Sequence, residues 1–359
     1  MEKNFSPINL TTGPVFIPDD VREIFARIPV SHRADDFVEA FKSLQQKICK
    51  STGARHVVFM TGSGTLANEA MIAQLKRSDK KGLILTNGEF GNRLINQSEK
   101  QSLKFDVYRK AWGEEYDLKE IEAMLASGKD LGWLLFTYCE SSTGCLADLS
   151  ALTALGKKYN VKVCVDAMSA IGNVPVPLKD ISIATCSSGK GLASFAGIAI
   201  VFTDAELTPD PNIPTYIDLG YYFKNNGIPF TISSNLIMAL NKAVDHSLKE
   251  EQLRKTAELS NLLIEKVSRL QGITVVNKDY RFKSHITTIV PSQGIRSVEL
   301  GDAIKAAGVE TSYNSGYLKE RNQLQISIMG QHSEKEILLF VTELEKALQR
   351  LSARKTVNA

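Results

Sequence analysis

The chain has 359 residues, 43% of them hydrophobic, which is enough for a large domain and a smaller one. Its 43 basic and 40 acidic residues nearly balance, and this argues against nucleic acid or a membrane surface as a partner. Five cysteines without a CxxC pair fit a reducing compartment better than a disulfide framework. Because the first residues lack the apolar segment of a signal peptide and no apolar run could span a bilayer, we expect a cytoplasmic protein.

Short apolar segments alternate with helical patterns from residue 56 to residue 202. Strands bounded by glycine and asparagine, with helices between them, predict an α/β domain with a mostly parallel sheet. The expected strands are 56–60, 82–86, 133–137, 161–165, 181–186 and 197–202, and the expected helices are 66–75, 90–101 and 149–159.

A different pattern follows a loop rich in proline and asparagine at 209–214. One long helix is expected from near Ser233 through Leu263. After it, strands are expected at 274–276, 285–290 and 324–328, and helices at 298–307 and 333–351. We therefore predict a large α/β domain at 15–250 and a smaller α+β domain at 251–359, to which the N-terminal segment 1–14 also belongs.

A glycine-rich turn at 61–65 (TGSGT) lies between the first expected strand and the helix after it. Glycine allows close backbone approach, and a helix N-terminus offers unpaired N–H groups to an anion. Ser63 and Thr65 add hydroxyl donors. The turn fits a phosphate site, with an ordinary capped turn as the alternative. The dinucleotide-binding glycine spacing is absent, because Ala67 stands at its last position.

Two ionisable residues come directly after other expected strands. Asp166 follows the strand at 161–165, and in open α/β sheets this end of a strand faces the ligand crevice. Its carboxylate can pair with a pyridinium nitrogen, cap a helix or bind a metal. Lys190 follows the strand at 181–186 in a segment rich in glycine and serine. A lysine that loses its proton can form an imine, and a plain surface lysine is the alternative.

The order of these features, with Lys190 lying 24 residues after Asp166, resembles the fold-type I enzymes that use pyridoxal 5′-phosphate (PLP). Over nearly its whole length the chain is similar to the class V aminotransferases. The segments that carry the resemblance are 10–14, 29–33, 62–65, 87–91, 140–144, 165–169 and 187–190. Segments 139–144 and 166–169 look most like the 2-aminoethylphosphonate–pyruvate branch of that family, and the alanine–glyoxylate branch comes next.

The resemblance implies a fold-type I transferase with a mostly parallel seven-stranded sheet in its large domain. It also implies a homodimer with active sites at the subunit interface, PLP as the cofactor and no metal. The implied reaction moves an amino group from a small amine or amino acid to a 2-oxo acid.

The resemblance also implies a role for each residue that matches a family motif. The cofactor phosphate would be held by Ser63, Gly64, Thr65 and Ser188, and Thr231 would complete the phosphate site of a neighbouring subunit. Phe90 would stack on the cofactor ring, where the family often has Trp, and Ser141 would donate to the phenolic oxygen of the ring. Asp166 would pair with the ring nitrogen, and Lys190 would form the Schiff base and move the proton.

The segment 324–330 departs from the family pattern. Family members carry an arginine here that binds the substrate carboxylate, and Gln325 stands in its place. A neutral amide cannot replace the two-pronged guanidinium. Arg33 and Arg321 are the nearest replacements by motif position, with a salt-bridged surface residue as the alternative for Arg33. The sequence therefore leaves the substrate open.

Other functions compete with a transaminase. A PLP-dependent lyase or cysteine desulfurase would need a cysteine late in the chain and usually a histidine before the lysine. No cysteine follows Cys186, and Gly189 precedes Lys190. A PLP-binding relative with an altered substrate or without turnover is compatible with Gln325. A sugar- or nucleotide-binding α/β protein is the alternative without PLP.

Overall fold

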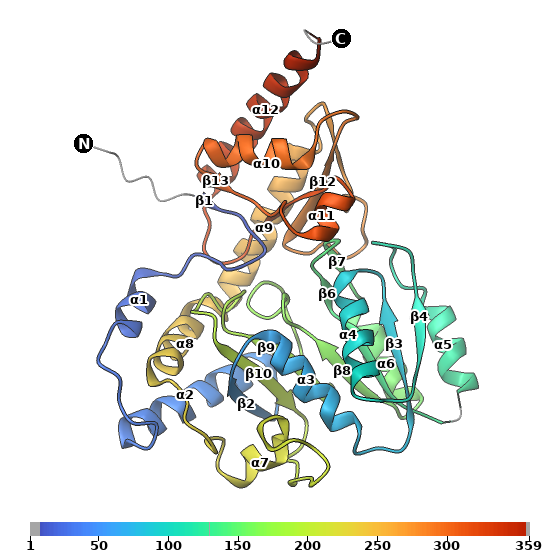
Figure 1. Ribbon diagram of the computed structural model, residues 1–359, viewed down its shortest axis with the longest axis vertical. Coiled ribbons are helices and arrows are strands. Elements are labelled where there is room, and N and C mark those ends of the chain that lie inside the picture. The colour runs from blue at the N-terminus through green and yellow to red at the C-terminus, as the bar shows by residue number, and fades with distance from the viewer. Residues whose placement is uncertain (1–7, 129, 357–359) are drawn as a thin grey trace.

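The computed structural model describes residues 8–128 and 130–356 of the chain. Figure 1 shows a large body around one broad sheet and a smaller body above it, with helix α9 (Glu250–Val267) reaching from one to the other. The predicted N-terminal segment 1–14 and small domain 251–359 both include terminal residues outside this description. None of the helices in the described part of the chain has the length and apolar character needed to cross a bilayer.

The large body is built on a seven-stranded sheet in the order β2-β10-β9-β8-β5-β3-β4. Neighbouring strands run parallel, except that β10 is antiparallel to both β2 and β9. The strands are β2 (His56–Thr61), β3 (Lys81–Thr86), β4 (Phe105–Arg109), β5 (Leu131–Thr137), β8 (Lys162–Asp166), β9 (Ile183–Ser187) and β10 (Ile198–Thr203). The predicted α/β fold and the mostly parallel seven-stranded sheet are confirmed.

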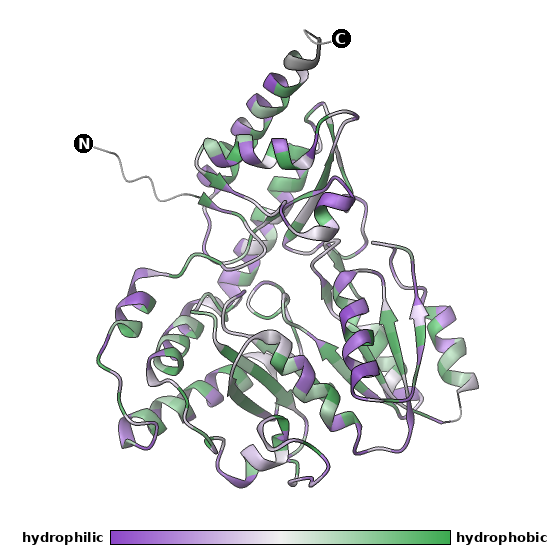
Figure 2. Ribbon diagram, in the orientation of Figure 1, coloured by the Kyte–Doolittle hydropathy of each residue, from purple (hydrophilic) through white to green (hydrophobic). Residues whose placement is uncertain are grey.

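Helices cover both faces of this sheet, which explains why its strands are almost wholly apolar. Along β2, Val57 and Phe59 join one core, while Val58 and Met60 join the other, as the two-residue period of a strand requires. The helices of this body are α1 (Asp19–Phe25), α2 (Asp35–Thr52), α3 (Gly64–Leu75), α4 (Glu89–Lys100), α5 (Leu118–Ser127), α6 (Leu149–Lys158), α7 (Leu219–Lys224) and α8 (Ser234–Ser247), with a short 3-10 turn at Thr215–Ile217. Figure 2 shows the sheet in green, and purple on the helices outside it.

The small body has a three-stranded antiparallel sheet in the order β11-β12-β14. Its separate apolar core includes Leu10 from the N-terminal segment as well as residues of α9 and α12. The elements of this body are β11 (Ile273–Val275), β12 (Ile286–Pro291), β14 (Leu324–Ser327), α10 (Ser297–Ala306), α11 (Gly316–Glu320) and α12 (Glu334–Thr356), and β1 (Ile8–Asn9) pairs with β13 (Val309–Glu310). The exact domain boundaries stay a prediction.

The long helix expected from Ser233 to Leu263 is wrong, because two helices occupy this region. At Lys249 the backbone is extended (φ −70°, ψ 136°), and this separates α8 from α9. Leu240 on α8 belongs to the core of the large body, whereas Leu263 on α9 belongs to that of the small body. Since the two helices bury their apolar faces in different cores, one straight helix could not serve both.

Candidate active site

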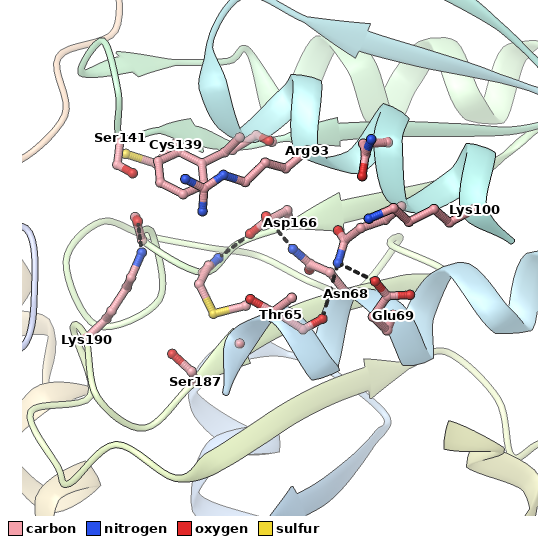
Figure 3. A pocket seen from close by; sticks show the side chains of 17 residues that line it. Thr65, Asn68, Glu69, Arg93, Lys100, Cys139, Ser141, Asp166, Ser187 and Lys190 are labelled. Carbon is pink, nitrogen blue, oxygen red and sulfur yellow. Dashed lines mark hydrogen bonds between the residues drawn. The ribbon is translucent and has the colours of Figure 1, made fainter. Parts of the chain in front are cut away.

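A cavity of about 440 Å³ lies at the carboxyl ends of β5, β8 and β9, between α3 and α4 (Figure 3). This is the size of a small-molecule site, and the edge of the sheet is where open α/β folds bind ligands. It is lined by Gly64, Thr65, Asn68 and Glu69 of α3, by Phe90, Arg93, Asn96, Gln97 and Lys100 of α4, and by Thr137, Cys139, Ser141, Asp166, Met168, Ser169, Ser187 and Lys190, which end or follow the strands.

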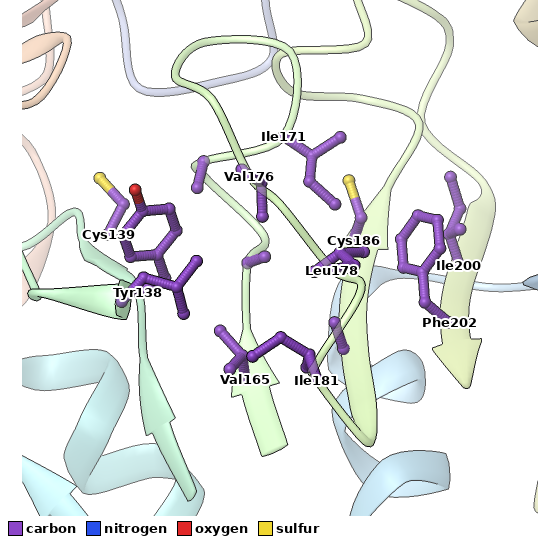
Figure 4. Packing of buried hydrophobic residues seen from close by; sticks show 14 of the residues in the cluster. Tyr138, Cys139, Val165, Ile171, Val176, Leu178, Ile181, Cys186, Ile200 and Phe202 are labelled. Atoms are coloured by element: carbon purple, nitrogen blue, oxygen red, sulfur yellow. The ribbon is translucent and has the colours of Figure 1, made fainter. Parts of the chain in front are cut away.

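The strand ends rest on a closely packed apolar core. Figure 4 shows Val165, Cys186 and Ile200 on neighbouring strands, with Ile171 and Leu178 covering them from the segment after β8. All five side chains are buried. This packing fixes the ends of β8 and β9, which carry the two ionisable residues that the sequence singles out.

Asp166 is the last residue of β8, and only 3% of it is exposed. Its Oδ1 accepts a hydrogen bond from the Met168 backbone N–H at 2.9 Å, and its Oδ2 accepts one from Asn68 Nδ2 at 2.8 Å. Burial raises the pKa of the Asp166 carboxyl, while these two donors and the charge of Lys190 act in the opposite direction. The carboxylate is therefore buried but held by donors on both oxygens.

Lys190 lies in the loop after β9, and its side chain points into the cavity. Its Nζ donates to Ser169 Oγ at 2.9 Å and lies 5.4 Å from the centroid of the Phe90 ring. Burial lowers the pKa of Lys190, and the Asp166 charge opposes this shift. A lysine that gives up its proton more readily is suited to imine formation.

Phe90 is held in the cavity wall by a buried carboxylate behind it. The backbone N–H groups of Phe90 and Gly91 donate to Glu140 Oε2 at 3.0 and 2.9 Å. Ser142 Oγ also donates to Glu140, whose side chain is 1% exposed. Burial raises the pKa of the Glu140 carboxyl. Glu140 thus caps the N-terminus of α4 and fixes the ring that faces the cavity.

The first turn of α3 forms the other end of the cavity. Ser63 is the N-cap residue, with an extended backbone and no capping hydrogen bond from its side chain. A Cβ at Gly64 would lie 2.3 Å from Met168 Sδ, so a larger residue there would displace the end of the Met168 side chain. A helix start leaves N–H groups without partners in the helix, and Thr65 and Ser187 add hydroxyls at the cavity. This end is suited to an anion.

The Ser188 hydroxyl lies outside the cavity, and its predicted contact with the cofactor phosphate stays a prediction. The Ser188 hydroxyl is fully buried, donates to the Phe195 carbonyl at 2.6 Å and accepts from the Ile198 N–H at 3.1 Å. Ser187, one residue earlier, lines the cavity instead. Ser187 is the last residue of β9, and successive side chains of an extended backbone point to opposite sides, so the two serines face different surroundings.

Two other predicted residues lie outside this cavity. Arg33 is exposed in the segment before α2, and the structure does not bring it to the Lys190 cavity. Thr231 is exposed beside Tyr216 and Phe230, at a separate small depression. Its predicted role in the site of a neighbouring subunit stays a prediction.

Gln325, on β14, is fully buried behind the cavity wall. Its Nε2 donates to the Ser141 carbonyl at 2.8 Å and to Thr288 Oγ1 at 3.0 Å. Gln325 therefore supports Ser141, which does line the cavity, from behind. Arg321 does not line the cavity either, because its guanidinium lies over the Trp112 ring, 3.7 Å from the centroid.

The structure adds residues that the sequence analysis did not single out. Arg93 and Lys100 line the cavity from α4, seven residues apart and hence on one helix face. Asn68 bonds to Asp166 from α3, where the neighbouring positions are mostly apolar. An amide next to the buried apolar positions Ala67 and Met71 was a signal that could have identified Asn68. The described residues contain no cluster of His, Cys, Asp and Glu able to hold a metal ion.

Comparisons with known proteins identify the family and the fold. The family model described as aminotransferase class-V matches residues 26–316. An uncharacterised aminotransferase of Methanocaldococcus jannaschii is 24% identical, over 94% of this chain and 92% of its own length. A 2-aminoethylphosphonate–pyruvate transaminase of Bacillus cereus is 26% identical, over 83% and 92%. The crystal structure of an alanine–glyoxylate aminotransferase from Nostoc sp. has the same fold, with a TM-score of 0.84, 24% identity and coverage of 96% and 95%.

Proposed function

Because the chain belongs to the class-V aminotransferase family, we propose that Lys190 binds the cofactor covalently and moves the substrate proton. The protein is an aminotransferase, and its cofactor is PLP. The observation that carries the proposal is the convergence of Lys190, the buried Asp166 carboxylate and the Phe90 ring on one cavity at the strand ends.

The cavity residues fit PLP. The Phe90 ring offers a flat surface on which a pyridine ring can stack. The first turn of α3, with Gly64 and Thr65, and the Ser187 hydroxyl offer donors for a phosphate. When bound, PLP supplies a carbon that accepts the amine and a ring that takes up electron density as a proton leaves the substrate.

Two residues of the chain would handle the two protons that matter for the reaction. The Asp166 carboxylate holds a proton on the ring nitrogen, which makes the ring a better electron acceptor. The Nζ of Lys190, when it carries no proton, would accept the proton from the substrate Cα. Its lowered pKa makes the neutral amine available for this transfer. Ser169 Oγ, 2.9 Å from Nζ, orients it.

We propose a small amine donor and a 2-oxo acid acceptor, such as the substrates in the names of the relatives. Arg93 is the arginine among the cavity-lining residues, and its guanidinium lies 4.8 Å from the Phe90 ring centroid. Arg93 Nε forms a surface ion pair with Glu89 Oε1 at 3.0 Å. Because such pairs contribute little stability, a substrate anion can replace Glu89 at little cost. Arg93, rather than Gln325, therefore meets the anionic group of the substrate.

An absorption spectrum tests the cofactor assignment. Protein supplied with PLP should show a visible band that borohydride fixes on Lys190, as peptide mass analysis can confirm. Adding 2-aminoethylphosphonate, alanine, serine, glutamate or amino sugars one at a time should shift the band for the true donor. Protein that takes up no PLP would refute the proposal, and a lyase product without amino transfer would favour the lyase alternative.

Two matched variants test the anion site. Arg93→Gln should raise KM for the 2-oxo acid by about 10- to 100-fold, because it removes a charge-assisted pair. Arg321→Gln, which alters a guanidinium outside the cavity, should leave this KM near the wild-type value. Equal KM values for both variants would argue against Arg93. The homodimer and the cytoplasmic location stay predictions from the sequence.

A further inference from the structure

We infer that Asn68 is a positioning residue which, fixed by Thr185, keeps Asp166 in the anionic form that the cofactor ring nitrogen requires. The inference rests on the proposed function, since it assigns a task to residues that act through Asp166. Neither Asn68 nor Thr185 belongs to a segment that carries the family resemblance.

The three side chains form one hydrogen-bonded chain from three separate elements. Thr185 Oγ1, on β9, donates to Asn68 Oδ1 at 2.6 Å. Asn68 Nδ2, on α3, donates to Asp166 Oδ2 at 2.8 Å (Figure 3). Thr185, Asn68 and Asp166 are 0%, 9% and 3% exposed, so the low dielectric of their surroundings strengthens these bonds.

The donor-to-acceptor direction of these hydrogen bonds decides whether the carboxylate or the protonated acid of Asp166 is favoured. An asparagine amide can turn either its oxygen or its NH₂ group toward a neighbour. Because Thr185 occupies Oδ1 with its proton, the NH₂ group faces Asp166, and a donor at this position favours the carboxylate over the acid. A reversed amide would present an oxygen to Asp166 and favour the protonated acid.

The other influences on Asp166 show why a side-chain donor matters here. Burial favours the neutral acid. Within the described part of the chain, the Met168 backbone N–H at 2.9 Å is the one further neutral donor that opposes it, and the charge of Lys190 acts in the same direction as this donor. That backbone bond is present whatever residue stands at 168. The neighbours of Asn68 on α3, such as Ala67 and Met71, are buried and apolar, so packing alone would accept an apolar residue at 68. The amide at 68 is therefore explained by its bond to Asp166.

The test uses the holoenzyme with PLP carrying ¹⁵N at the ring nitrogen. In the wild type, the ¹⁵N chemical shift should report a protonated nitrogen across neutral pH. Asn68→Leu removes the donor at similar volume and should lower the pH at which the nitrogen loses its proton by 1 or more units. It should also lower kcat by about 10-fold or more with little change in KM, since only the reacting state depends on ring protonation.

Changes at Thr185 keep the inference testable if Asn68→Leu does not fold. Thr185→Val removes the hydroxyl at nearly constant volume and should shift the ¹⁵N titration in the same direction by a smaller amount, whereas Thr185→Ser should restore the wild-type titration. Folded, PLP-loaded Asn68→Leu or Thr185→Val with an unchanged ¹⁵N titration would overturn the inference. A wild type that binds no PLP would instead overturn the proposed function, so the two failures are distinguishable.

Discussion

The large body and the small body contribute different kinds of groups around the cavity, the former charged and the latter neutral. All the cavity-lining residues come from the large body, and they include Arg93, Asp166 and Lys190. The small body contributes neutral buried groups behind the wall, chiefly Gln325 and His285. The ionisable groups that line the cavity thus come from strand ends and from α3 and α4 of the large body, while the small body supports the cavity wall with neutral groups.

His285 illustrates the neutral side most clearly. It is 1% exposed, and among the described residues neither ring nitrogen has a hydrogen-bond partner. Burial lowers its pKa to about 3, and the charge of Lys190 acts in the same direction. A protonated imidazole there would add a second positive charge near Lys190. The neutral His285 thus adds no positive charge near Lys190.

Removing the Lys190 amine from the large body should have the largest effect on catalysis. Lys190→Ala should abolish covalent attachment of PLP and lower kcat by about 10²- to 10⁴-fold, because the general base is lost. Stopped-flow absorbance of each half-reaction measures this. The control is Lys179→Ala, an exposed lysine outside the cavity. If Lys190→Ala had the same kcat as this control, the proposed catalytic role of Lys190 would be refuted.

On the small-body side, the expected effect is on stability and depends on pH. The folded-state pKa of His285, about 3, lies below the ordinary value of 6.5, so the folded protein binds fewer protons between these values. The stability contributed by neutral His285 is present above pH 6.5 and is lost as pH falls toward 3, by up to about 1.4 kcal/mol per pH unit.

His285→Phe should reduce this loss, and the cavity of about 120 Å³ beside His285 leaves room for the larger ring. Urea unfolding of wild type and variant at several pH values between 7 and 4.5 isolates the difference. A variant as acid-sensitive as the wild type would mean that His285 does not titrate across this range.

A smaller effect is expected where the small body supports the cavity wall. Gln325→Leu removes the donor to the Ser141 carbonyl and Thr288 Oγ1, both buried. The free energy of unfolding should fall by about 1–3 kcal/mol, the usual effect of leaving buried acceptors unpaired. Denaturant unfolding measures the loss, and steady-state kinetics should show less change than for Arg93→Gln. The reverse ranking would place Gln325 in contact with the substrate.

Sequence patterns predicted the parts of this molecule that local rules determine. Asp166 and Lys190 were identified because each directly follows a buried strand, and such strand ends meet at one edge of a parallel sheet. Strand β4 was missed because it lies at the sheet edge, with Tyr108 its one buried residue, so it has no apolar run. The end of α8 carries neither glycine nor proline to mark it.

Contacts between distant segments could not be predicted in this way. Asn68 reaches Asp166 across 98 positions of sequence, and no local pattern encodes that pairing. The choice between Ser187 and Ser188 depends on the register of β9 to a single residue. Sequence therefore singled out Asp166 and Lys190, which the structure brings to one cavity, but not the residues that hold them in place.

Ser187 and Ser188, which precede Lys190, give the smallest expected effects and test which of the two serines contacts the cofactor. Ser188→Ala leaves the Phe195 carbonyl and the Ile198 N–H without their buried partner, and should lower the free energy of unfolding by about 1 kcal/mol. It should not change the dissociation constant of PLP. Ser187→Ala removes a hydroxyl at the cavity and should weaken PLP binding by about 3- to 10-fold, the value of one hydrogen bond. Equilibrium dialysis and urea unfolding of both variants separate the roles. If Ser188→Ala weakened PLP binding more than Ser187→Ala, then Ser188 would reach the phosphate in the holoenzyme, and the loop before Lys190 would have to rearrange when the cofactor binds.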